Sequence, residues 1–136
     1  MAVFVATDYD IVIGGTNLSD RITAVDLPVE VDTQESTNFD SSGWKENTPG
    51  LKSGSITIGF NQDFAASETD ATLWPLLGTA TTIVVKPTSS AVGSTNPSFT
   101  GSFVVTSLTP VAGKVGDLAT QNVTWPLTGA LTRATS

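Results

Sequence analysis

The chain of 136 residues contains no cysteine and no histidine. Without cysteine it can form neither disulfide bonds nor thiolate metal sites. Without histidine it lacks the commonest general base, a common metal ligand and the side chain that titrates near neutral pH. These absences argue against nucleophilic or acid–base catalysis and against a metal centre. We therefore expect a non-enzymatic protein that needs no cofactor.

Long apolar runs and a basic surface are also missing. No run approaches the roughly 20 residues that cross a bilayer, and the N-terminus lacks the basic start and apolar stretch of a secretion signal. A net charge of −7 is the opposite of what a nucleic-acid binder shows. The length fits one domain, and 12 glycines and 7 prolines favour a β-rich fold.

The negative charge is concentrated in one part of the chain. Residues 1–50 hold nine acidic and two basic side chains and so carry the whole excess, whereas residues 51–136 hold four of each. Solubility accounts for any single acidic residue. The confinement of the excess to one segment requires a more specific explanation.

One strand carries this charge with a clear alternation. Between Ile22 and Thr33, four apolar side chains alternate with three acidic ones, which predicts a strand with one buried and one solvated face. Pro28 cannot donate a ladder hydrogen bond, so we expect a bulge or an unpaired edge there. The apolar residues are Val25, Leu27, Val29 and Val31; the acidic residues are Asp26, Glu30 and Asp32.

The segment of about 34–52 has no period and is rich in turn residues, which predicts a long loop between two strands. It nevertheless carries large apolar side chains, which a disordered loop seldom has. Either the loop docks on a partner or Trp44 folds back on its own domain. The residues that we single out in it are Phe39, Trp44, Lys45, Glu46 and Leu51.

Residues 54–86 hold the one convincing helix, about Ser67 to Leu77, between two strands. Ser67 stands three residues before Asp70, a shortened form of the capping box. Pro75 costs a helical hydrogen bond and clashes with the preceding turn, so we expect a kink; a helix that ends at Leu73–Trp74 is the alternative.

We expect this helix to pack on a sheet. The core that they form together is predicted to contain Ile56, Ile58, Phe60, Leu73, Trp74, Leu77 and Trp125.

The remaining strands complete a single domain, residues 1–136, with N- and C-terminal arms. Alternation and β-branched residues predict a mainly β fold: a two-sheet sandwich or split barrel flanked by the helix. The predicted further strands are Ile11–Ile13, Thr81–Val85, Phe99–Ser107 and Leu118–Leu127, and residues 129–136 are expected to form a tail.

An ordered set of short motifs resembles the tail tube (major tail) proteins of long, flexible-tailed bacteriophages. The likeness covers nearly the whole chain, and no single motif in it is chemically diagnostic. The motifs are GGTNLSDRITAVDL (14–27), PGLKSG (49–54), NQDF (61–64), LWPLLG (73–78), TNP (95–97) and GDLA (116–119).

This resemblance implies a structural virion protein that forms hexameric rings, stacked into the hollow tube through which the genome is ejected. It implies that the acidic strand faces the lumen and that the loop of about 34–52 and the terminal arms tie one ring to the next. The implied partners are further copies of the chain and the tape-measure, tail terminator and tail tip proteins. DNA would pass without specific binding, and no membrane is involved. The implied location is the virion tail, after assembly in the host cytoplasm.

Two other functions stay open. A β-sandwich adhesion or carbohydrate-binding module on a virion or cell surface would use an exposed Trp44 with nearby acidic residues. A tail terminator or head–tail connector would share the fold but form single rings. A small enzyme is the weakest alternative, because histidine and cysteine are absent.

Overall fold

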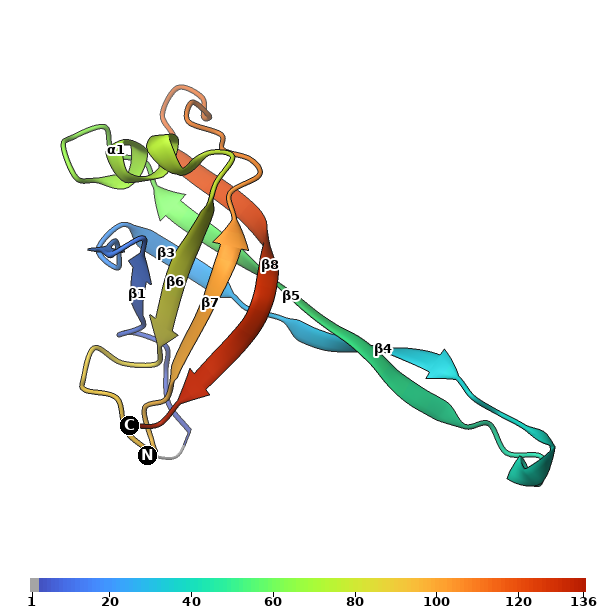
Figure 1. Cartoon of the computed structure of the whole chain (residues 1–136). Coiled ribbons are helices and arrows are strands. Elements are labelled where there is room, and N and C mark those ends of the chain that lie inside the picture. Colours follow the sequence, from blue (N-terminus) through green and yellow to red (C-terminus); the bar gives the residue numbers. More distant parts are fainter. Residues whose placement is uncertain (1–2) are drawn as a thin grey trace.

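The computed structural model describes residues 3–136, so the first two residues of the predicted N-terminal arm lie outside the described residues. The fold is mainly β with one short α-helix (Figure 1). Its elements are β1 (Asp10–Ile13), β2 (Thr16–Asn17), β3 (Ile22–Asp26), β4 (Val29–Glu35), the 3-10 turn η1 (Phe39–Ser41), β5 (Asn47–Asn61), α1 (Thr69–Leu73), the 3-10 turn η2 (Trp74–Leu76), β6 (Ala80–Lys86), β7 (Ser98–Val104) and β8 (Thr120–Ala134).

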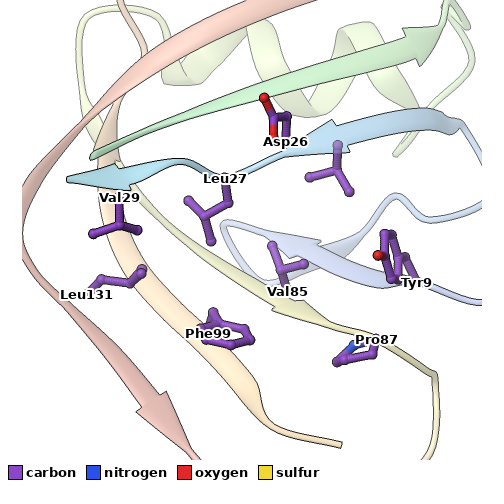
Figure 2. Close-up of a pocket in the computed structure, with 9 residues that line it drawn as sticks. Tyr9, Asp26, Leu27, Val29, Val85, Pro87, Phe99 and Leu131 are labelled. Atoms are coloured by element: carbon purple, nitrogen blue, oxygen red, sulfur yellow. The ribbon is translucent and has the colours of Figure 1, made fainter. Parts of the chain in front are cut away.

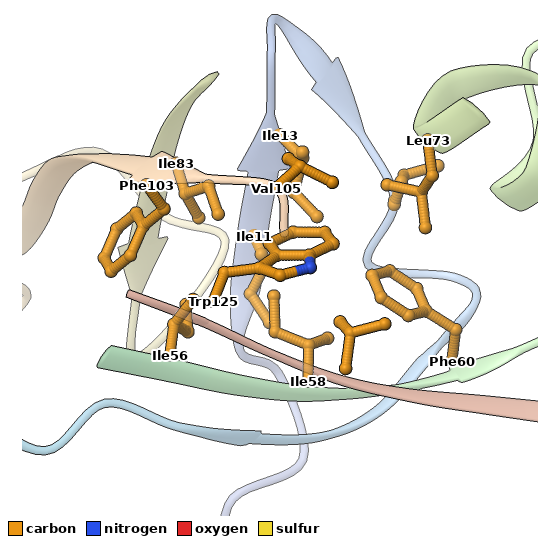
Figure 3. Packing of buried hydrophobic residues seen from close by; sticks show 12 residues of the cluster. Ile11, Ile13, Ile56, Ile58, Phe60, Leu73, Ile83, Phe103, Val105 and Trp125 are labelled. Atoms are coloured by element: carbon orange, nitrogen blue, oxygen red, sulfur yellow. The ribbon is translucent and has the colours of Figure 1, made fainter. Parts of the chain in front are cut away.

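A single antiparallel sheet curls over itself into a half-barrel. Its strand order is β2-β1-β6-β7-β8-β5-β3, and β4 pairs only with β5. The long strand β8 belongs to both layers, because residues 120–126 pair with β5 and residues 127–134 pair with β7. The two predicted layers are therefore continuous through β8, and the core lies between them (Figure 3).

Strand β8 extends beyond its predicted end. Residues 129–134, expected as part of a tail, continue the strand to Ala134. Between the pairs Ser102–Thr128 and Thr100–Thr132 the register shifts by two extra residues on β8, and Gly129 adopts a φ of +84° there. This bulge bends β8 within the part that pairs with β7, and glycine accepts the left-handed conformation without strain.

The predicted strand of residues 22–33 is divided in two. β3 ends at Asp26 and β4 begins at Val29, so that Pro28 lies in the break between them. The break agrees with the expectation that proline interrupts the ladder. Strand β7 also ends earlier than predicted, at Val104, and the chain continues as a loop from Val105.

The helix is shorter than predicted and differs at both ends. Ser67 has a φ of +63° and does not cap it; Glu68 is the N-cap residue, and the Asp70 amide donates to the Asp63 carbonyl at 3.0 Å. The α-helix ends at Leu73, and Pro75 lies in η2. The alternative in which the helix ends before proline is therefore the observed one, and the favoured kink is wrong.

Five of the seven predicted core residues are buried: Ile56, Ile58, Phe60, Leu73 and Trp125. Trp74 and Leu77 correct the prediction, because they are 57% and 41% exposed. A helix of five residues turns only Thr69 and Leu73, four positions apart, toward the sheet. Trp74 follows about 100° farther around the axis and points away from the core.

Replacing the two tryptophans is expected to change the free energy of unfolding by very different amounts. Trp125 is fully buried and its indole N–H donates to the Ser107 carbonyl at 3.0 Å, so Trp125→Ala is expected to lower the free energy of unfolding by about 3–5 kcal/mol. The matched variant Trp74→Ala should change it by less than about 1 kcal/mol. Urea denaturation of both variants measures the difference, and equal losses would contradict the assignment of the core.

Candidate assembly surfaces

A β-hairpin projects from the half-barrel and forms a long arm, residues 29–54 (Figure 1). It pairs β4 with the first half of β5 from Val29–Gly54 to Glu35–Asn47, with a bulge between Val31 and Thr33. The segment predicted as a loop, 34–52, is therefore largely paired strand, and only residues 36–46 form the turn. Every residue of β4 is exposed, so beyond its base, where Val29 and Gly54 meet the half-barrel, the arm stands free of the rest of residues 3–136.

The arm tip, residues 36–46, has a defined conformation. The Ser36 amide donates to the Glu46 carbonyl at 2.8 Å, and the Glu46 amide donates to the Thr37 hydroxyl at 2.9 Å. Asn38 and Ser41 form a reciprocal capping box around η1. These bonds satisfy backbone groups locally and hold the turn in one shape.

The arm tip presents two aromatic rings to solvent. Phe39 is 109% exposed and Trp44 is 78% exposed. A shallow pocket of about 610 Å³ lies between them and is also lined by Thr37, Asn38 and Lys45. Trp44 does not fold back on its own domain. Exposed large apolar residues in a rigid turn are typical of a surface that another molecule covers.

The other predicted loop residues also lie on the arm. Leu51 is exposed on β5, and Lys45 forms only a weak, solvated ion pair with Glu35 at 3.9 Å. Glu46 follows Lys45 at the tip and takes part in no ion pair of the described chain. All five residues therefore belong to one projecting element, with Leu51 on the shaft and the other four at the tip.

The outer face of β3, β5 and the first half of β8 is polar and open. Asp26 lies opposite Thr57, and Thr57 lies opposite Thr124 with their hydroxyls 3.1 Å apart. These residues and Asn122 are exposed, whereas the alternate residues face the core. No lysine or arginine occurs in β3, in residues 55–61 or in residues 120–126. The face therefore consists of small polar groups and one carboxylate.

The three predicted lumen acids are not brought together on this face. Only Asp26 lies in β3, where the sheet continues through β5 to β8. Glu30 and Asp32 lie on β4, beyond the break at Pro28, and belong to the arm. Their separation corrects the interpretation of residues 22–33 as one continuous strand.

An apolar groove of about 320 Å³ opens between β3 and strands β6 and β7 (Figure 2). Asp26 borders it with its carboxylate directed away from the apolar side chains. The groove marks where the curled sheet does not close. Its apolar lining consists of Tyr9, Val25, Leu27, Val29, Val85, Pro87, Phe99 and Leu131.

An ion-pair cluster ties the start of β3 to the helical corner. Arg21 Nε lies 2.9 Å from the Asp63 carboxylate and 3.4 Å from that of Glu68. The Ala65 amide and the Arg21 guanidinium both donate to Asp63 and lower the pKa of this carboxyl below its usual value. The hydrogen bond with Asp63 and the nearby carboxylates of Glu68 and Asp20 raise the pKa of Arg21.

This cluster predicts a loss of stability in acid. Because the pKa of Asp63 is lower in the folded than in the unfolded chain, its ionised carboxylate contributes to the free energy of unfolding above about pH 4. This contribution disappears as the pH falls through the pKa of the folded chain. Between about pH 4 and 2, the melting temperature of Asp63→Asn should therefore fall less steeply than that of the unaltered chain. The control is Asp117→Asn, at a carboxylate without an ion pair in the described residues, which should follow the unaltered chain. Parallel curves for Asp63→Asn and the unaltered chain would contradict the role of the cluster.

No group of three or more acidic residues in residues 3–136 is placed to hold a metal ion. None of the helices in this part of the chain is long and apolar enough to cross a bilayer.

The sequence analysis missed one group of exposed apolar residues at the end of the half-barrel that bears α1. Val111, Val115 and Leu118 lie in the loop of residues 105–119, and Phe64 lies in the neighbouring loop of residues 62–68. Residues 105–107 and 118–119 of the first loop were predicted to lie in strands, and no function was assigned to the residues between them. Its signal was apolar residues placed between glycines, which loops of any kind can contain.

Comparison with known proteins shows the fold. No protein-family model matches the chain, and no match is found among curated proteins. A chain from the tail of an empty gene transfer agent (GTA) particle, obtained with helical refinement and C6 symmetry, has a TM-score of 0.65 and 21% identity, covering 82% of this chain and 81% of that one. A chain from the virion of a native GTA particle has a TM-score of 0.72 and 19% identity, covering 92% and 95%. A chain of an extracellular contractile injection system (PVC) sheath–tube complex in the extended state has a TM-score of 0.67 and 16% identity, covering 99% and 93%.

Proposed function

We propose that the chain is a structural subunit of a phage-like tail tube. In this proposal it forms hexameric rings that stack into a hollow conduit for DNA, and it is not an enzyme. The observation that carries the proposal is the projecting arm, whose apolar tip is exposed and covered by no other part of residues 3–136. The shared fold supports it, because one chain with this fold comes from a tail with C6 symmetry.

Free strand edges support association side by side within a ring. Within residues 3–136, β3 pairs only with β5, and residues 127–134 of β8 pair only with β7. An unpaired edge presents backbone donors and acceptors that a neighbouring chain can complete. In a closed ring each subunit would offer one edge and receive another, so that no edge remains exposed.

The polar outer face of β3, β5 and β8 suits the wall of the conduit. DNA must slide along a tube wall without binding it. Lysine and arginine would hold phosphates, whereas hydroxyls and a carboxylate do not attract them. We infer that Asp26, Thr57, Asn122 and Thr124 line the lumen and that Glu30 and Asp32 do not. The tape-measure, terminator and tip proteins would then meet the tube at its lumen or its two ends.

Electron microscopy of the concentrated, purified chain tests this function. The expected result is long hollow tubes with sixfold symmetry. Single rings would support a tail terminator instead. A chain that stays monomeric, alone and with preformed tail tips, and that binds glycans through the exposed Trp44 would support the adhesion module.

A further inference from the structure

The second exposed apolar surface, which we call the crown, consists of Phe64, Val111, Val115 and Leu118. Two contacts bring its loops together: the Gln62 amide donates to the Ala119 carbonyl at 3.0 Å, and the Gln62 side chain donates to the Pro110 carbonyl. Val115 is 104% exposed and stands between Gly113 and Gly116, both in left-handed conformations. The crown therefore consists of exposed apolar side chains on two adjoining loops.

The loop of residues 105–119 is held at its start. The buried Gln121 side chain accepts a hydrogen bond from the Thr109 amide at 2.7 Å. The indole of Trp125 donates to the Ser107 carbonyl, and the Gln62 side chain donates to the Pro110 carbonyl. These bonds fix residues 107–110, from which the crown residues of this loop project. Their effect is to reduce the conformational entropy that the loop would lose on binding.

The crown and the arm tip face away from each other. In Figure 1 the loop before β8 lies at the end of the half-barrel with α1, whereas the arm projects from the opposite side toward the other end. When one chain carries two different surfaces that fit each other and point apart, copies of it associate head to tail. If the copies are related by translation along an axis, this contact repeats without closing. A stack of rings has this geometry.

The two surfaces can fit together in shape and in charge. The arm tip has a hollow beside Phe39 and Trp44, and the Val115 side chain on the crown is fully exposed. Lys114, beside Val115, and Asp117, beside Leu118, take part in no ion pair in residues 3–136, and neither do Asp40 and Glu46 at the arm tip. Lys114 can pair with Asp40 or Glu46 of a second copy, which favours an approach of the arm tip on the Val115 side of the loop.

We propose that the arm tip of one copy docks on the crown of a second copy, with Val115 between Phe39 and Trp44 and with Lys114 beside Asp40 and Glu46. This inference rests on the proposed function, because it names the receptor for the arm in the next ring. It assigns to the loop of residues 105–119 the role of an assembly surface.

Cross-linking tests the contact directly, because the natural chain has no cysteine. Lys45→Cys borders the arm-tip concavity and Val115→Cys lies on the crown; both replacements keep the aromatic rings. In assembled tubes, a short thiol-reactive cross-linker should convert the double variant into a ladder of multimers. The control pairs Val115→Cys with Lys52→Cys on the arm shaft and should give no ladder. Tubes of the double variant that yield no more ladder than the control would overturn the inference and leave the proposed function intact.

A mixing experiment separates the two surfaces. Val115→Asp keeps the arm tip but places a charge on the crown, and it should raise the critical concentration for tubes by at least about 30-fold. Val115→Leu keeps the site apolar and should polymerise like the unaltered chain. Trp44→Ala keeps the crown but loses an aromatic ring of the arm tip. In a mixture, the arm tip of a Val115→Asp ring can dock on the crown of a Trp44→Ala ring, and no further junction can form. The mixture should therefore give paired rings. Normal tubes from Val115→Asp, or no paired rings in the mixture, would overturn the inference. An unaltered chain that never assembles, even on tail tips, would overturn the proposed function with it.

Discussion

A chain in which Asn-Gly replaces residues 36–46 is expected to fold normally and to form no tubes. Glu35 and Asn47 are paired residues of the arm, so a two-residue turn can join them without altering the shaft. The replacement removes Phe39 and Trp44, the two largest exposed side chains of the arm tip. If each acts as an interface hot spot of about 2 kcal/mol or more, the critical concentration should rise by about 10³-fold.

Sedimentation and electron microscopy measure the polymer, and thermal denaturation measures the fold. The melting temperature should stay close to that of the unaltered chain, because the arm tip contributes no residue to the apolar core. Lys52→Ala on the shaft is the control and should polymerise normally. Tubes at ordinary protein concentration from the shortened chain would show that the arm tip is not an assembly surface.

The arm was the element that sequence patterns described least well. Alternation reveals a strand only when one of its faces is buried, as for Ile56, Ile58 and Phe60 in the second half of β5. Both faces of the first half of β5, residues 47–54, are largely solvated and carry no such period, whereas β4 alternates apolar and acidic residues although it too is exposed. Pro49 and Gly50 further disguise the start of β5 as a turn.

Irregularities within strands explain most of the remaining differences. Gly129 suggested the end of β8, yet in the structure it lies in a bulge within the part of this strand that pairs with β7. Conversely, the alternation from Val25 to Asp32 suggested one strand, although Pro28 divides it and sends Glu30 and Asp32 onto the arm. A glycine or proline shows that the ladder is disturbed, but the three-dimensional pairing decides how.

The two proposed assembly surfaces differ in how far the sequence could identify them. Phe39 and Trp44 drew attention because large aromatic residues are unusual in a turn-rich segment. The valines of the crown did not, since isolated exposed valines are ordinary on protein surfaces. Only the structure shows that Val115 and Phe64 lie in adjoining loops and that buried side chains hold one of these loops in place.

Adding positive charge to the polar sheet face is expected to leave tube formation intact and to make the tube bind DNA. The variant Asp26→Lys/Thr57→Lys/Thr124→Lys places three lysines on the exposed face of β3, β5 and β8, away from the core. In a ring of six subunits these lysines would surround the lumen and neutralise phosphates on the passing duplex. Particles with this tube should package DNA but deliver it poorly, so their infectious titre should fall.

The salt dependence of binding separates phosphate contacts from other causes of a low titre. If six or more phosphates are neutralised, the affinity of variant tubes for duplex DNA should fall by about 10³-fold or more between 50 and 200 mM salt, whereas unaltered tubes should not bind. Glu30→Lys/Asp32→Lys is the matched control, because it also raises the charge by four units but places the lysines on the arm. Normal titre for the sheet variant would exclude this face as the wall. DNA retained only by the arm variant would instead place Glu30 and Asp32 in the lumen and move the wall from the sheet to the arm.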